Sequence, residues 1–320
     1  MPENRYDKTP RPGQGHFVAA TEDVKVGVVD AVSVDQKPSS MWRDAWRDMS
    51  HRPLFWISAA MILIVVVVAI APGAFTAQLP RDGCVLPDSL QPPSSEHIFG
   101  LDKNGCDIYT RTLYGARASV LVGLLSTAFV VVLGTAIGAI AGYYGGWTDT
   151  ILSRITDIFF AVPFVLAAIV ILSVVPSRNA LAVALVLASF GWTTIARITR
   201  GAVLSVKNNE FVTAAKALGM SRAAILWRHV LPNSAAPIIV YSTVALGTFI
   251  VAEATLTFLG IGLDNSTVSW GGDLSNGQSS IRTNPEIMFY PAAALAFTVL
   301  GFIMLGDVVR DALDPKARKR

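Results

Sequence analysis

The chain has 320 residues, of which 52% are hydrophobic and only 15% are charged, with a net charge of +3. Because a soluble domain usually carries about 25% charged residues, this composition excludes an ordinary soluble protein and favours a membrane protein. The two cysteines and four histidines have no zinc-ligand spacing, so we expect no metal site. The small net charge says little alone, and we expect no nucleic-acid partner.

The first 50 residues are polar and charged, and the first apolar run begins only at Leu54. A secretory signal peptide would place its apolar region within the first ~30 residues, so the sequence predicts a retained first helix. Residues 1–40 combine mixed charge with poor apolar periodicity, and we expect a disordered cytoplasmic tail there.

Residues 41–53 have the pattern of an amphipathic helix. Trp42 and Trp46 are four positions apart and share one helical face, whereas Arg43 and Arg47 share another. This arrangement predicts a helix lying in the inner membrane interface, with an ordinary amphipathic linker as the alternative.

Six stretches are long and apolar enough to cross a bilayer, which requires about 20 residues of helix. The six predicted spans are residues 54–71, 118–148, 158–175, 179–196, 233–259 and 287–306. Six such runs leave too little polar surface for a soluble protein to cover them. The sequence therefore predicts an all-α membrane protein whose transmembrane domain covers residues 54–310.

The distribution of lysine and arginine predicts the orientation of these spans. If the N-terminus lies inside, 20 of the 26 basic residues fall in cytoplasmic segments, including those of the C-terminal tail at 311–320. Under the positive-inside rule this bias places both termini in the cytoplasm. In the second predicted span Gly134, Gly138 and Gly142 share one face, which predicts close helix packing within the chain or against a partner.

Both cysteines fall in the loop at residues 73–117, which this orientation places outside the cell. Because that side is oxidising, the pair predicts a disulfide between Cys84 and Cys106. Two unpaired thiols are the alternative.

The segment at residues 197–232 is the longest predicted cytoplasmic loop. A helix is expected to begin at Glu210 and to include Ala214 and Ala215, whose small side chains permit close approach of another backbone. Gly219 can end this helix in a left-handed conformation.

A second short helix is expected at residues 222–230. Asn208 or Asn209 can cap the first helix and Ser221 the second, and Pro232 marks the entry to the next span. Two short helices projecting from the membrane can dock into a groove of a cytosolic partner, although a solvated hairpin without a partner fits the same residues.

This segment resembles the coupling motif of ABC importer membrane subunits, which reads E-A-A, three residues, G, nine residues, I, one residue, L-P. The matching positions are Thr213-Ala214-Ala215, Gly219, His229 and Leu231-Pro232. Thr213 replaces the motif's Glu and His229 replaces its Ile, and the form seen here is similar to the dipeptide, oligopeptide and nickel branch of the family.

The resemblance extends over nearly all of the chain after residue 95. Further matching segments are Gly100-Leu101-Asp102, Gly105-Cys106-Asp107, Leu113 to Arg117, Asp157 with Pro163, Glu253 to Gly262, Ser269-Trp270-Gly271, Gly306-Asp307, Arg310-Asp311 and Leu313-Asp314-Pro315. Cys106 replaces an Arg of the pattern, which fits a lineage-specific disulfide, and Ile303 stands where the family often has Asn.

The resemblance implies a type I ABC importer permease fold with six transmembrane helices, cytoplasmic coupling helices and a place in the bacterial inner membrane. It also implies three kinds of protein partner besides membrane lipid and a peptide substrate: a second homologous permease subunit, two ATP-binding subunits and an extracytoplasmic solute-binding protein. The residues that would couple to the ATPases are Glu210, Ala214, Ala215, Gly219, Leu231 and Pro232.

We expect no catalytic residue and no cofactor in this chain. It contains no G-x-x-x-x-G-K-[ST] phosphate loop and no Gly-Lys pair at all, so ATP and Mg²⁺ would bind to the partner subunits. An enzyme embedded in the membrane would need a nucleophile and base or a metal-ligand set, and the sequence offers neither.

Two acidic residues are candidates for the translocation pathway. Glu253 lies deep in the fifth predicted span, toward its outer end, and an ionisable residue there indicates a pathway; a structural pair with Arg282 or a partner chain is the alternative. Asp157 is expected at the inner start of the third span, where it can instead favour a helix N-terminus beside Arg154.

Three functions remain open at this stage. The first is a peptide importer subunit, and the second is the same class of transporter for a nickel chelate or a haem-like solute. The third is a channel or secondary transporter acting alone, which would usually show internal repeats and charged residues near the midplane of the membrane.

Overall fold

The structure is a computed structural model, and it describes residues 41–313. The predicted disordered tail at 1–40 and most of the predicted basic tail at 311–320 lie outside these residues. The chain divides into two units after Asp44, and the packing described below concerns the second unit.

The described residues are nearly all helical. The helices are α1 (Met41–Ser50), α2 (Pro53–Ile70), α3 (Ile108–Tyr144), α4 (Gly146–Ala161), α5 (Phe164–Val174), α6 (Ala180–Val206), α7 (Glu210–Ala217), α8 (Arg222–Ile225), α9 (Leu231–Asn233), α10 (Ala235–Phe258), α11 (Trp270–Gly277) and α12 (Glu286–Leu313). In the described part of the chain there is no strand, and the only β-type pairing is an isolated bridge between Leu101 and Asp107.

Five helices, α2, α3, α6, α10 and α12, are long and apolar enough to cross a membrane. A sixth span exists if α4 and α5 count as one, although they are bent by 78° at the break between them. The predicted all-α membrane fold is therefore confirmed, but the third span predicted at 158–175 is not one helix, because its residues fall partly in α4 and partly in α5. Pro163 lies at this break. Proline breaks a helix because it has no N–H for the helical hydrogen bonds and its ring clashes with the preceding turn.

Three helices extend well beyond the predicted spans. The first, α3, begins at Ile108, and the Asp107 side chain caps it by accepting a hydrogen bond from the Thr110 amide. The loop predicted at 73–117 therefore ends ten residues early. Likewise α6 continues to Val206 and α12 to Leu313, so the loop predicted from residue 197 begins only after α6. Hydropathy marks the part of a helix that lies in lipid, and charged turns that continue the helix into water are missed.

The glycine face of α3 packs against α6 within the same chain. A Cβ atom at Gly134 would lie 2.7 Å from the Trp192 carbonyl oxygen, and one at Gly142 would lie 2.9 Å from that of Arg200. Gly138 lies against Ala196 in the same way. Only glycine permits this approach, so the open choice between an internal and an external partner is resolved in favour of α6.

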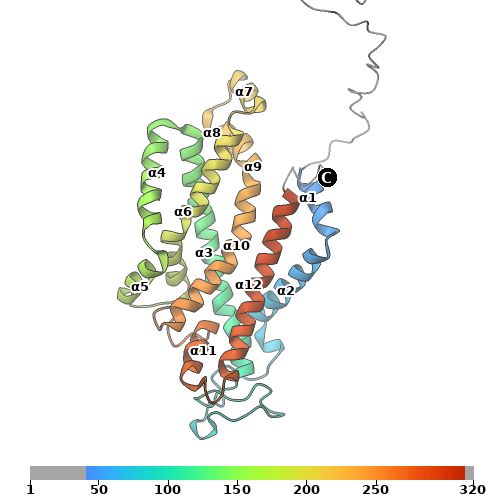
Figure 1. The fold of residues 1–320 in the computed structure, drawn as a ribbon, viewed down its shortest axis with the longest axis vertical. Helices are drawn as coiled ribbons and strands as arrows, with labels where there is room; N and C mark the ends of the chain where they lie inside the picture. Colours follow the sequence, from blue (N-terminus) through green and yellow to red (C-terminus); the bar gives the residue numbers. More distant parts are fainter. Residues whose placement is uncertain (1–40, 314–320) are drawn as a thin grey trace, which may run out of the picture. The chain divides into compact units, whose positions relative to one another are not determined.

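The second unit has two functional ends (Figure 1). The hairpin of α7 and α8 lies at one end of the long helices, and α11 lies at the other with the loop that precedes α3. Between them a hydrophobic core of α3, α5, α6 and α10 residues fixes the long helices; its fully buried members include Val122, Val130, Leu187, Ile195 and Leu256.

Candidate functional site

The hairpin that resembles a coupling motif is defined by its helix ends. Helix α7 ends in a Schellman motif, in which the Met220 amide donates to the Ala215 carbonyl and the Gly219 amide donates to that of Lys216. Gly219 has φ of +76° and no neighbouring atom within 4 Å of a Cβ position. Its role is therefore conformational, because L-residues disfavour this backbone geometry.

The second half of the hairpin leads into span α10. Ser221 accepts a hydrogen bond from the Ala224 amide and caps α8, as predicted. The helix predicted at 222–230 instead becomes a π-helical turn at Leu226–Val230, immediately before α9 with Pro232. Asn209 precedes α7, but its side chain makes no capping bond, so the predicted asparagine cap is wrong.

The hairpin has one buried face and one exposed face. Val212, Ala215, Ile225 and Val230 are buried against Val203 of α6. Ala215 thus fixes the hairpin to its own chain, whereas Ala214, Glu210 and Pro232 are exposed and Leu231 is half-buried.

Large apolar side chains lie on the exposed face, and the sequence analysis did not single them out. Leu218 is 83% exposed and Trp227 is 62% exposed, and Phe211 is exposed as well. Such a cluster at the end of a helical bundle is typical of an interaction surface. Helical periodicity read across the hairpin could have found it, since Leu218 falls outside the buried pattern of Val212 and Ala215.

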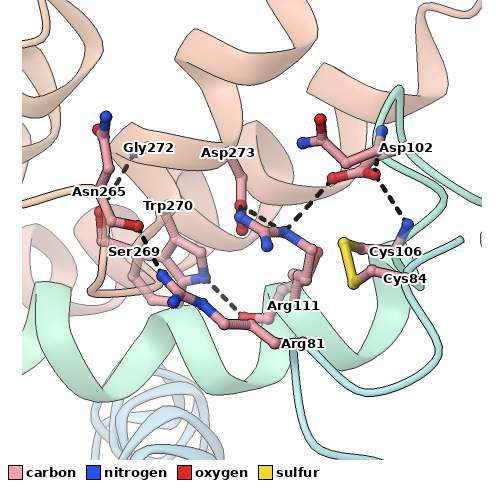
Figure 2. A network of polar contacts seen from close by, with 12 residues as sticks. Arg81, Cys84, Asp102, Cys106, Arg111, Asn265, Ser269, Trp270, Gly272 and Asp273 are labelled. Carbon is pink, nitrogen blue, oxygen red and sulfur yellow. Dashed lines mark hydrogen bonds and ion pairs between the residues drawn. A yellow bond between two sulfur atoms is a disulfide. The ribbon is translucent and has the colours of Figure 1, made fainter. Parts of the chain in front are cut away.

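A buried ionic cluster lies at the opposite end of the bundle (Figure 2). Arg111 of α3 donates from Nε to Asp273 Oδ1 of α11 at 2.9 Å, and its Nη2 donates to the same oxygen. Arg111 Nε also lies 3.6 Å from Asp102 Oδ2 in the loop. We refer to Asp102, Arg111 and Asp273 as the Arg111 cluster. All three side chains are largely buried.

The loop that supplies Asp102 is closed by a disulfide between Cys84 and Cys106. Asp102 Oδ1 accepts from the Cys106 amide at 2.9 Å and from the Asn104 amide at 2.8 Å. The disulfide and the Arg111 cluster therefore lie side by side, as Figure 2 shows.

Trp270 attaches α11 to α3 a second time. Its indole Nε1 donates to the Thr112 carbonyl at 2.8 Å, and its backbone amide donates to Ser119 Oγ at 3.3 Å. Asp102 and Trp270 occur in the motifs quoted above, but Arg111 and Asp273 were not expected to meet, because nothing in the sequence pairs positions 162 residues apart.

Glu253 is completely buried inside this chain. Its Oε1 accepts from Thr257 Oγ1 at 2.8 Å, and that hydroxyl in turn accepts from the Leu263 amide at 3.0 Å. Among the described residues Glu253 forms no ion pair, with Arg282 or otherwise. Through Thr257 it holds the turn that follows α10.

Asp157 lies near the end of α4 rather than at a helix start, so the expected N-terminal position is wrong. Its carboxylate lies 2.8 Å from Arg197 of α6 and 3.8 Å from Arg154. Nearby, Arg200 Nη2 donates to Asp149 Oδ2 at 2.7 Å. These pairs line a polar cavity of about 540 Å³ between α3, α4 and α6.

A second cavity lies at the break between α4 and α5. It has a volume of about 240 Å³, and its lining includes Pro163, Phe190, Thr194, Tyr241 and Phe249. Backbone outside a helix is tolerated at membrane depth only where it is buried in protein or lines a cavity. This geometry makes the break a better candidate for a pathway than Glu253.

In the described part of the chain no group of three or more His, Cys, Asp or Glu side chains could hold a metal ion. The candidate functional features at the two ends of the bundle are therefore surfaces, ion pairs and cavities.

Residues 134–319 match the family model described as the inner membrane component of binding-protein-dependent transport systems. The chain belongs to this family. Residues 40–93 match a second model, the N-terminal transmembrane domain of oligopeptide transport permease C. The family resemblance inferred from the hairpin and the ordered motifs is thus confirmed, and the chain is a multi-pass inner membrane protein of a transport system.

Several curated relatives match almost the whole chain. A dipeptide transport system permease protein of Alkalihalophilus pseudofirmus is 41% identical over 87% of this chain and 91% of its own length. An oligopeptide transport system permease protein of Bacillus subtilis is 36% identical over 91% and 94%. A glutathione transport system permease protein of Escherichia coli is 36% identical over 87% and 91%.

Among solved structures, an inward-facing methionine ABC transporter has a TM-score of 0.48 and 19% identity, covering 62% of this chain and 94% of that one.

Proposed function

We propose that the chain is a membrane subunit of an ATP-driven importer of dipeptides or oligopeptides. The observation that carries this proposal is the hairpin at Glu210–Asn233, a rigid element with an exposed apolar face in a chain whose relatives include dipeptide and oligopeptide permeases. ATP hydrolysis takes place on partners, and this chain transmits the movement of those partners to its spans.

The proposed assembly contains a second homologous permease, two ATP-binding subunits and an extracytoplasmic solute-binding protein. Leu218, Trp227 and Phe211 contact a groove of an ATP-binding subunit, while Gly219 and Ala215 maintain the shape of the hairpin. Helix α10 follows α9 directly, so a force applied to the hairpin reaches the span that packs against α3 and α12.

We further propose that both termini and the hairpin are cytoplasmic, as the distribution of basic residues indicates. The disulfide loop then lies outside, where oxidising conditions maintain the bond. Thiol labelling of intact cells tests this: neither Cys84 nor Cys106 should react before reduction. Full labelling of both without reductant would show that the disulfide is absent.

The solute pathway in this proposal runs past the α4–α5 break and not past Glu253 or Asp157. The aromatic and threonine side chains there suit a solute with both apolar and polar groups, as peptides are. Nickel chelates and haem-like solutes remain the second candidate, because the resemblance covers that branch too.

The test is uptake by the reconstituted complex. Proteoliposomes with all partner subunits should accumulate labelled di- or tripeptides only when ATP and the binding protein are present. Accumulation of a nickel chelate or haem with no peptide uptake would contradict the peptide assignment and leave the importer class intact. Uptake without ATP would contradict both.

A further inference from the structure

The Arg111 cluster has an unbalanced charge. One guanidinium lies between two carboxylates, those of Asp102 and Asp273, and all three side chains are largely buried. With both acids ionised the group carries a net negative charge. A buried charge without compensation is unfavourable, and two carboxylates sharing one site favour protonation of one of them.

The same site lacks hydrogen-bond donors. Asp102 Oδ2, Asp273 Oδ2 and Thr112 Oγ1 are buried and have no hydrogen-bond partner among the described residues. They line a cavity of about 10 Å³, which is about the size of one water molecule. A proton on the Asp273 carboxyl group would supply a donor to one of these oxygens.

Besides the three members of the cluster, no charged residue among those described lines this small cavity. Arg81 lines a neighbouring cavity together with Arg111, but its guanidinium donates to the Asn265 carbonyl. Besides Arg111, α3 contributes the uncharged Thr112. Helix α12 contributes Ile287 and Pro291 to the cavity. Helix α10 carries Glu253, whose bonded oxygen is directed to Thr257.

One further titratable pair lies nearby in the loop. His97 Nδ1 is 3.1 Å from Asp107 Oδ1, and Asp107 caps α3 three residues before Thr110. An imidazole can also gain a proton between neutral and mildly acidic pH. The experiment below therefore needs a variant at this position.

We propose that Asp273, buried beside Arg111 and the second carboxylate of Asp102, binds one exchangeable proton, and that this proton strengthens the attachment of α11 to α3. Protonation leaves one carboxylate for Arg111 and gives the other acid an O–H that donates to a neighbouring oxygen. In the proposed orientation this site faces the outside of the cell, so external acid would tighten the outer end of the bundle.

The direction of the pH effect follows from linkage. Burial is the largest cause that raises the pKa of Asp273 from 3.8 to about 6, against the opposing charge of Arg111, while Asp102 raises it further. Because the attached state has the higher pKa, proton binding stabilises attachment. The contribution is complete below pH 3.8 and is lost as the pH rises through about 6.

Hydrogen exchange of the α11 amides tests the proposal in the full-length chain in lipid nanodiscs, with intrinsic exchange rates corrected for pH. Lowering the pH from about 7.5 to about 5 should increase protection of Trp270–Gly277 by about tenfold. Protection that does not change with pH in the wild-type chain would overturn the proposal.

Variants assign the effect to the cluster. Asp273→Asn, an uncharged isostere, should hold α11 in the protected state at both pH values and so abolish the pH dependence. Asp102→Asn should keep part of the pH dependence, because burial is the largest cause that raises the pKa of Asp273 and it remains in this variant. His97→Gln should retain the full tenfold change. A pH response that survives in Asp273→Asn, or disappears in His97→Gln, would contradict the assignment.

Infrared difference spectroscopy gives an independent readout that does not depend on the stability of one variant. The wild-type chain should develop a protonated carboxyl C=O band over the same pH range, and Asp273→Asn should lose it. Absence of such a band in the wild-type chain would also overturn the proposal.

Discussion

Gly134 of α3 lies directly against Trp192 of α6, so that a Cβ atom at position 134 would stand 2.7 Å from the Trp192 carbonyl oxygen. This contact is repeated one and two turns further along α3, at Gly138 and Gly142. The close approach of the two helices fixes α6, the helix that directly precedes the hairpin, against α3.

Gly134→Ala should destabilise the protein by about 1–3 kcal/mol, because the added methyl group meets backbone that cannot move without separating the helices. Reversible unfolding in detergent measures this change. Gly201→Ala is the matched control, since it lies in α6 with no atom within 4 Å of its Cβ position. It should be neutral or slightly stabilising. Equal losses in the two variants would contradict the packing argument.

Gly219→Ala should impair coupling, because alanine at φ of +76° costs about 1–2 kcal/mol and shifts the end of α7. Solute-stimulated ATPase activity of the assembled complex should fall while expression stays normal. Gly219→Asn should retain more activity, since asparagine tolerates the left-handed region better. If alanine and asparagine behave like the wild-type residue, the conformational role of Gly219 is wrong.

Leu218→Ser should weaken binding of the ATP-binding subunits by about tenfold, which corresponds to about 1.4 kcal/mol, without destabilising the chain. Leu86, which is also highly exposed but lies at the other end, provides the control Leu86→Ser with no expected effect. Ala215→Asp should behave differently, because its charge enters the buried face and unfolds the hairpin. Affinity measurements combined with proteolysis of the hairpin separate these outcomes. Unchanged affinity in Leu218→Ser would remove this residue from the interface.

Glu253→Gln should retain import, because an amide oxygen can still accept from Thr257. Glu253→Ala should cost about 1–3 kcal/mol, since it removes that acceptor from a buried site. Uptake and thermal unfolding are the measurements. A change of solute preference in Glu253→Gln, with unchanged stability, would favour the pathway role that the sequence left open.

The sequence predicted the parts of this protein that depend on local chemistry. Apolar length located the spans, small residues located the contact face of α3, and the position of Gly219 located the end of α7, because each feature follows from a few adjacent residues. Pro163 was expected at most to kink its span, and the full break of 78° was not predicted, since proline is common in membrane helices and often only bends them. The Arg111 cluster was not predicted either, because it joins three segments that only the tertiary fold brings together.

The exposed face of the hairpin illustrates the same limit. The motif at Ala214 and Ala215 was recognised as a unit, but one alanine is exposed and the other is buried. Which residue faces the partner depends on how α7 packs against α6, and the motif spacing alone does not contain that information.

The most direct test of the proposed role is affinity purification of the full-length chain from its native membrane, followed by mass identification of partners and ATPase assays with peptides. We predict recovery of a second permease, two ATP-binding subunits, and ATPase activity that rises when peptide-loaded binding protein is added. A chain that purifies alone and transports solute without ATP would contradict the proposed role.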